Sequence, residues 1–225
     1  MKITRYLWRG VLSIALCSGI GAQAKPLIVV QSNPAELYPS GSVVEGAELE
    51  LHSGQQLKVI TGNGTVLNIQ TGADGNLMEE TDTGDNALSI ALAEINGDPM
   101  LGNAMRNGRV PPKVWMANVE SQGTYCAEGG SIKLWRANAN QVTTLTMQQQ
   151  GGGQAKKIKW AVGQDTYDWR FNSGKSYLAK MDSGANTANR LTFYQVPGSM
   201  RFTPKRVVWM AKKGCIQQAQ RLFPW

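Results

Sequence analysis

The feature that most constrains the fold of this chain is a succession of short apolar stretches separated by turn residues. Leucine alternates with glutamate in Glu48–Leu51, which places Leu49 and Leu51 on one face of an extended strand. Turn-forming residues recur at intervals of roughly 8–12 residues. Among them, Gly62-Asn63-Gly64 favours a tight hairpin. The pattern predicts a mainly β protein.

Two segments have helical periodicity instead. In residues 85–96, Leu88, Leu92 and Ile95 form one apolar stripe, and Gly97-Asp98-Pro99 ends the segment. In residues 203–222, Thr203-Pro204 is typical of a helix start, and apolar residues again share one face. We therefore expect two small β-sandwich or roll-like domains with a connecting helix and a C-terminal helix.

Charge divides the chain into two parts that meet near Pro111-Pro112. Residues 25–109 contain four Lys or Arg and eleven acidic residues, a net charge of −7, whereas residues 110–225 have a net charge of +11. We interpret 25–109 as an acidic domain and 110–225 as a basic one. Such asymmetry suggests an anionic partner for the basic part. The partner could be the acidic part itself, another envelope protein or an anionic envelope polymer; the alternative is an evenly spread, solubilising charge.

The N-terminus has the layout of a secretory signal peptide. Lys2, Arg5 and Arg9 precede an apolar run, and Ala22-Gln23-Ala24 is a small-residue cleavage site. We predict cleavage after Ala24, so that residues 1–24 are removed, and a periplasmic location, with secretion as the alternative. Later segments lack the run of about 20 apolar residues that a transmembrane helix needs.

Removal of the leader would also remove Cys17 and leave two cysteines, Cys126 and Cys215. In an exported protein an even pair predicts one disulfide bond. A disulfide between Cys126 and Cys215 would close a loop of nearly 90 residues. In the chain-entropy model such a bond stabilises the folded protein by roughly 4 kcal/mol. The alternative is a pair of reduced, buried thiols.

The run from Gly41 to Ile69 resembles the repeat-like core of FecR-type periplasmic domains, in which a strand and a Gly turn lead into a hairpin. The later part, with its Trp-containing strands and terminal Gly214-Cys215, is similar to uncharacterised secreted proteobacterial proteins that add a second β-domain. A FecR regulator also has a membrane span and a cytoplasmic anti-sigma segment, for which we find no counterpart here. The resemblance therefore implies a fold and not the regulatory role.

Residues for catalysis are scarce. His52 is the only histidine and lies on the charged face of its predicted strand, next to a turn. Pairing of Cys126 with Cys215 would remove thiol ligands for zinc and thiol nucleophiles. We expect no catalytic residue, no metal site and no cofactor, and export argues against nucleic acid as a partner.

The candidate binding residues are aromatic and basic. Trp135-Arg136 and Trp169-Arg170 repeat a pairing that is common at binding surfaces, although packing in the core is the alternative for both tryptophans. Basic clusters add a second set of candidates, namely Lys156, Lys157, Lys159, Lys212 and Lys213.

These observations favour an exported, non-enzymatic binding or assembly protein of the bacterial envelope, whose basic C-terminal domain contacts an anionic partner. One alternative is a hydrolase acting on peptidoglycan or another envelope polysaccharide, which would need two convergent carboxylates or an activated serine. Another is a periplasmic component of a signalling system.

Overall fold

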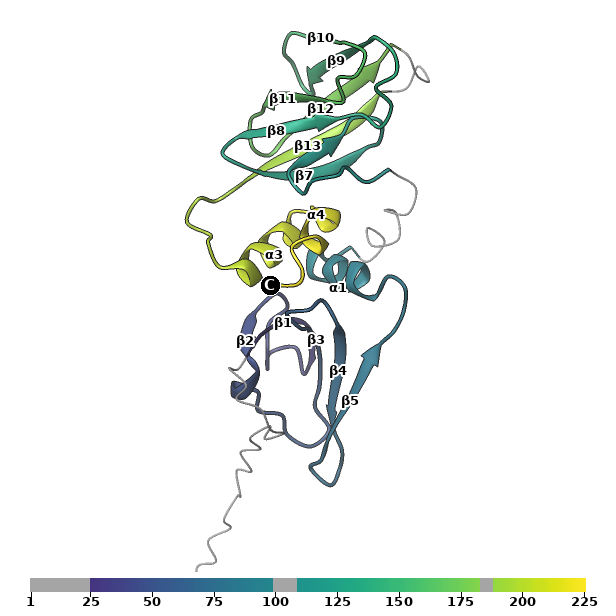
Figure 1. Ribbon diagram of the computed structural model, residues 1–225. Helices are drawn as coiled ribbons and strands as arrows, with labels where there is room; N and C mark the ends of the chain where they lie inside the picture. The colour runs from purple at the N-terminus through teal and green to yellow at the C-terminus, as the bar shows by residue number, and fades with distance from the viewer. Residues whose placement is uncertain (1–24, 99–108, 183–187) are drawn as a thin grey trace, which may run out of the picture.

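The computed structural model describes residues 25–98, 109–182 and 188–225, so the predicted signal peptide lies outside the described residues. Strands predominate, which confirms the prediction of a mainly β protein. Figure 1 shows three parts stacked along the molecule: an N-terminal sheet, a layer of helices and a C-terminal sandwich.

The N-terminal sheet has five antiparallel strands in the order β2-β1-β3-β4-β5. One of its faces is apolar and is covered by the segment between β1 and β3, which contributes Tyr38, Leu49 and Leu51. The predicted hairpin joins β3 to β4, and its Gly64 has a φ of +86°, which glycine adopts without strain. The strands are β1 (Pro26–Asn33), β2 (Val43–Glu45), β3 (Gln56–Ile60), β4 (Val66–Thr71) and β5 (Leu77–Asp82).

The C-terminal sandwich packs a five-stranded sheet against a three-stranded one. The larger sheet has the order β10-β9-β12-β13-β7 and the smaller one β11-β8-β6. Apolar side chains from both sheets, including Leu134, Leu145 and Phe193, fill the space between them. The strands are β6 (Met116–Asn118), β7 (Gly123–Glu128), β8 (Ser131–Trp135), β9 (Thr143–Gln149), β10 (Lys156–Trp160), β11 (Thr166–Arg170), β12 (Lys175–Met181) and β13 (Asn189–Val196).

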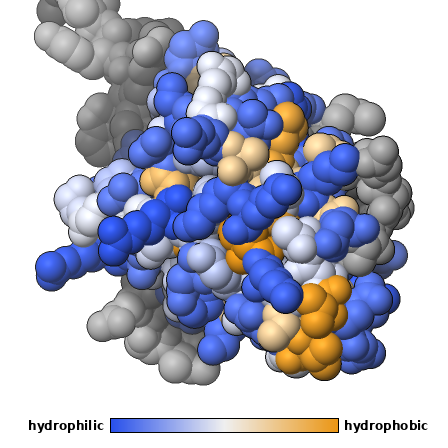
Figure 2. All heavy atoms as spheres, turned by 90° about the horizontal axis from the view of Figure 1, so that it is seen from above, coloured by the Kyte–Doolittle hydropathy of each residue, from blue (hydrophilic) through white to orange (hydrophobic). Residues whose placement is uncertain are grey.

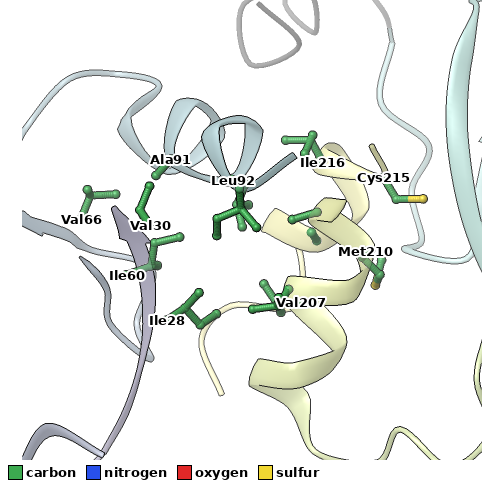
Figure 3. Close-up of a cluster of buried hydrophobic side chains, with 14 of the residues drawn as sticks. Ile28, Val30, Ile60, Val66, Ala91, Leu92, Val207, Met210, Cys215 and Ile216 are labelled. Carbon is green, nitrogen blue, oxygen red and sulfur yellow. The ribbon is translucent and has the colours of Figure 1, made fainter. Parts of the chain in front are cut away.

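The helical layer consists of α1 (Ala87–Asn96), α3 (Thr203–Lys212) and α4 (Ile216–Gln220). The predicted C-terminal helix is thus two helices, because Gly214 adopts a φ of +81° between them. Both helices pack on α1, so the end of the chain shares a core with the N-terminal sheet (Figure 3). None of the helices in the described ranges has the length and apolar character needed to cross a membrane.

Three elements build this shared core. Leu92 of α1 lies between Val207 of α3 and the residues of the sheet in Figure 3, and all are excluded from solvent. Each fully buried aliphatic side chain of this size contributes roughly 1.5–3 kcal/mol relative to an exposed one. Apolar contact therefore holds the closing helices on the N-terminal sheet.

A disulfide joins the helical layer to the sandwich. Cys126 of β7 and Cys215, which precedes α4, are bonded with an S–S distance of 2.00 Å, and both are at most 1% exposed. The bond confirms the predicted pairing. It attaches the layer to the outer face of the five-stranded sheet at its β7 edge.

Gln218 of α4 covers the same edge. Its carboxamide oxygen accepts a hydrogen bond from the Cys126 N–H at 2.6 Å, and its nitrogen donates to the Cys126 carbonyl at 2.8 Å. The side chain thus occupies both main-chain groups that Cys126 would otherwise offer to a further strand. The Gln218 nitrogen also donates a hydrogen bond to the Val114 carbonyl, which attaches the segment before β6 to α4.

The C-terminal residues lie on the hairpin of the N-terminal sheet. The Trp225 N–H donates to the Gly62 carbonyl at 3.0 Å, and the rings of Phe223 and Trp225 are 4.3 Å apart. A β-carbon added at Gly62 would come within 3.0 Å of the Trp225 indole nitrogen. Glycine at this position therefore allows the close approach of the C-terminal tryptophan.

Candidate binding surfaces

The two Trp-Arg pairs do not form joint binding surfaces, because successive residues of a strand point to opposite faces. Trp135 is half-buried on the outer side of β8, whereas Arg136 is fully buried. Trp169 is 8% exposed and packs in the sandwich core, whereas Arg170 points to solvent. The alternative of core packing therefore holds for Trp169.

Arg136 has a structural role that its place in the sequence did not indicate. Its guanidinium donates to the carbonyls of Gln141, Ala161 and Gln164 at 2.7–2.9 Å and lies 5.3 Å from the centre of the Trp160 ring. The charge is thus satisfied inside the protein, where it holds two loops together. Arg136 has no surface to offer a partner, which corrects its interpretation as a binding residue.

The predicted basic clusters also separate in space. On β10, Lys157 and Lys159 point outward, while the Lys156 ammonium lies 5.4 Å from the centre of the Trp169 ring. The aliphatic part of Lys212 passes over Gly41 of the N-terminal sheet region, where an added β-carbon would be 2.7 Å away. Lys213 lies over the Tyr194 ring. Only Lys157 and Lys159 remain close neighbours on one open surface.

These two lysines belong to a larger group on the outer face of the five-stranded sheet. Lys157 is paired in register with Thr146, which is paired with Lys180 of β12. Arg190 of β13 follows on the next strand, opposite Leu178. We call the set Lys157, Lys159, Lys180 and Arg190 the basic face.

The cations of the basic face are exposed and form no ion pair with any other described residue. Asp182 is the acidic residue nearest to them in register, and its carboxylate accepts a hydrogen bond from the Thr144 N–H at 2.8 Å. This bond lowers the pKa of Asp182. The helical layer covers only the β7–β13 end of the sheet, where Cys126 and Val196 join its core. The basic face stays open.

Hydrophilic residues dominate the end of the sandwich that Figure 2 presents, and its hydrophobic patches are small. Two of the exposed large hydrophobic residues of the chain, Val142 and Val162, lie in the loops that Arg136 links. The sandwich thus presents charge and hydrogen-bonding groups over most of this end. That character suits a polar or charged partner better than an apolar one.

A second surface is a groove of about 260 Å³ on the N-terminal sheet. It lies on the face that carries α1, beyond the part that the helices cover. Carboxamides are its main feature: Gln31 and Asn33 from β1, Gln56 from β3, and Asn68 and Gln70 from β4. We call it the amide groove. No local sequence pattern indicates this groove, because its carboxamides are spread over three strands and are brought together only by the strand register.

His52 is exposed beside a turn, as expected from its position. Among the residues that the structure describes, no three His, Cys, Asp or Glu side chains lie close enough together to hold a metal ion. The chain matches no protein-family model, and no curated protein matches it significantly.

Proposed function

We propose that this is an exported binding or assembly protein of the cell envelope, whose C-terminal sandwich holds an anionic partner on the basic face. The observation that carries the proposal is the set of four exposed, unpaired cations on one open sheet face. Of the lysines expected to bind, Lys157 and Lys159 keep this role. Lys180 and Arg190 complete the proposed site, and the predicted residues Arg136, Lys156, Lys212 and Lys213 are not part of it.

The layout of the basic face suits an extended polyanion. Strands in a sheet are roughly 4.8 Å apart, so Lys157 and Lys180, which flank β9, have backbones roughly 10 Å apart. Between them lies Thr146, a hydroxyl that can bind the same ligand. Spaced charges over a flat polar surface give attraction that depends on ionic strength. The FecR-type resemblance of residues 41–69 fits an envelope location, and we keep it as part of the proposal.

The test is charge reversal of the basic face. The variant Lys157→Glu/Lys159→Glu/Lys180→Glu and the wild-type mature protein are passed over immobilised dextran sulfate and incubated with envelope fractions at low and high salt. Surface ion pairs are worth up to about 1 kcal/mol each, so we expect at least roughly tenfold weaker binding of the variant at low salt.

The matched control is Lys113→Glu/Lys175→Glu/Lys205→Glu, which makes the same change in net charge with exposed lysines outside the basic face. This control should bind more tightly than the test variant. Equal loss in both variants would show a dependence on net charge alone and would contradict a defined binding face. Capture of a protein or a polymer from the envelope fraction identifies the class of the anion.

A further inference from the structure

The amide groove is built from two rows of side chains that run across the strands. In the first row, Asn33, Gln56 and Gln70 are consecutive partners in register, followed by Met78 of β5. In the second row, Gln31 is followed by Lys58, Asn68 and Glu80. With strands roughly 4.8 Å apart, the first row offers one hydrogen-bonding group on each of β1, β3 and β4, and the second row offers one on each of its four strands, at nearly even spacing.

The five carboxamides of these rows are exposed, and none of them is hydrogen bonded through its side chain to another described residue. Each carboxamide has two N–H donors and one oxygen acceptor. A ligand that fills the groove must therefore supply both acceptors and donors along its length. Hydroxyl groups do this, since each can donate and accept.

The charge in the groove excludes an anionic ligand. Lys58 is its cation, and its ammonium is bound by both carboxylate oxygens of Glu94 from α1, at 3.0 and 3.1 Å. Glu79 and Glu80 add two negative charges at the β5 end. The centre of the groove is uncharged, and these two carboxylates would repel carboxylates, sulfates and phosphates. The same reasoning separates this groove from the basic face.

Met78 adds an apolar contact at the end of the first row. Its side chain is 50% exposed although it is large and hydrophobic. A sugar ring has hydroxyl groups at its edges and an apolar C–H face. The carboxamides of the first row match the hydroxyl groups, and the Met78 thioether at its end matches the apolar face. The volume of about 260 Å³ is close to the lower limit of roughly 300 Å³ for small-ligand pockets. This size fits a short section of a chain.

From these observations we infer that the amide groove binds a neutral polyhydroxylated chain, namely an uncharged oligosaccharide. The carboxamides of Gln56 and Gln70 hydrogen-bond its hydroxyls, and Met78 contacts the apolar face of a ring. The Lys58–Glu94 ion pair closes the groove toward α1 and keeps its cation neutralised. The groove acts independently of the basic face, which lies on a different sheet.

The experiment titrates the mature protein with neutral oligosaccharides of four to six units and follows binding by calorimetry and by NMR shifts of side-chain amides. The probes are oligomers of β-linked glucose, α-linked glucose and N-acetylglucosamine. The test variant Gln56→Met/Gln70→Met keeps side-chain length and removes the hydrogen bonds. Loss of two hydrogen bonds predicts at least about tenfold weaker binding.

The matched control is Gln122→Met/Gln154→Met, which changes two exposed glutamines of the sandwich. It should bind the oligosaccharide as the wild type does, and so should the charge-reversed variant of the basic face. Absence of binding by all three neutral probes would overturn the inference, as would binding that Gln56→Met/Gln70→Met leaves unchanged. Preferential binding of dextran sulfate in the groove would overturn it as well. The outcomes with neutral probes do not bear on the basic face, whose test uses different residues and a charged probe. Dextran sulfate bound in the groove would be distinguished from dextran sulfate bound on the basic face by the Lys157→Glu/Lys159→Glu/Lys180→Glu variant, which weakens only the latter.

Discussion

The two five-stranded sheets share one helical layer but differ in what they leave uncovered. Each sheet has one face packed against a protein core and another face that the helices cover in part. The uncovered part of the N-terminal sheet has carboxamides and an ion-paired lysine, whereas that of the C-terminal sheet has unpaired cations. The same arrangement thus presents two surfaces of different charge, one basic and one with an uncharged centre.

The attachment of the layer differs too. On the N-terminal sheet the helices are held by apolar side chains such as Leu92 and Val207. On the C-terminal sheet they are held by the Cys126–Cys215 bond and by the Gln218 carboxamide. An extended apolar core holds the first sheet, whereas specific bonds and the packing of Val196 hold the second. Substitutions at either attachment of the helical layer test this difference.

The largest effect is expected from removing the disulfide. Cys126→Ser/Cys215→Ser should lower the free energy of unfolding by about 4 kcal/mol, because the covalent link closes a long loop. Urea unfolding followed by Trp fluorescence measures the change, with the wild type in reductant as the control. An unchanged midpoint would mean that the other contacts alone fix the sandwich on the helical layer.

Next in size are two leucine truncations, one in each core. Leu92 and Leu145 are both fully buried. Leu92→Ala and Leu145→Ala should each cost about 3 kcal/mol. If the parts unfold as one unit, both variants shift a single transition in a thermal scan. Two separate transitions, each moved by only one variant, would show that the shared layer does not couple the sheets.

A smaller effect is expected at the edge of β7. Gln218→Ala removes the hydrogen bonds to Cys126 and Val114 and leaves buried main-chain groups unpaired, which should cost about 2 kcal/mol. Exchange of the Cys126 amide hydrogen should become faster than in the wild type. Gln220→Ala in the same helix is the control, and equal exchange rates in both variants would contradict the role of Gln218.

The smallest effect appears only at alkaline pH. Burial raises the pKa of Tyr125, opposed in part by hydrogen bonds to Ser121 and Asn118. The unfolded chain then loses this proton near pH 10, before the folded protein does. Stability should therefore be unaffected below that pH and fall above it. Tyr125→Phe should be less sensitive between pH 9 and 11, and equal slopes for both proteins would refute the assignment.

Local patterns predicted much of the architecture. The turn spacing, the stripe in residues 85–96 and the even pair of cysteines were sufficient for the β class, α1 and the disulfide. The strand predicted from the alternation in Glu48–Leu51 was wrong: Glu48 ends a short 3-10 helix, and Leu49 and Leu51 lie in the irregular segment that covers the sheet. Local patterns could not show that α3 and α4 pack on α1, because a local pattern reveals that a helix has an apolar face but not which element packs against that face. Long-range packing of this kind depends on the whole fold.

The candidate surfaces were less predictable for a related reason. Adjacent residues such as Trp135-Arg136 suggest one joint surface, but successive side chains of a strand point to opposite faces of the sheet. Conversely, Lys157 and Lys180 are far apart in sequence and meet only through the register of β10, β9 and β12. The register of the strands decides which residues share a sheet face, and the register is known only from the structure.

The docking of residues 203–225 on the N-terminal sheet has a consequence for the timing of folding. Ile28 and Val207 share a core, and Trp225 closes the hairpin near Gly62, so the sheet cannot complete its packing while these late residues are still being synthesised. The nascent chain should remain open and protease-sensitive until α3 and α4 arrive. For the exported protein that we propose, this delay would keep the earliest strands from packing before the chain has crossed the membrane.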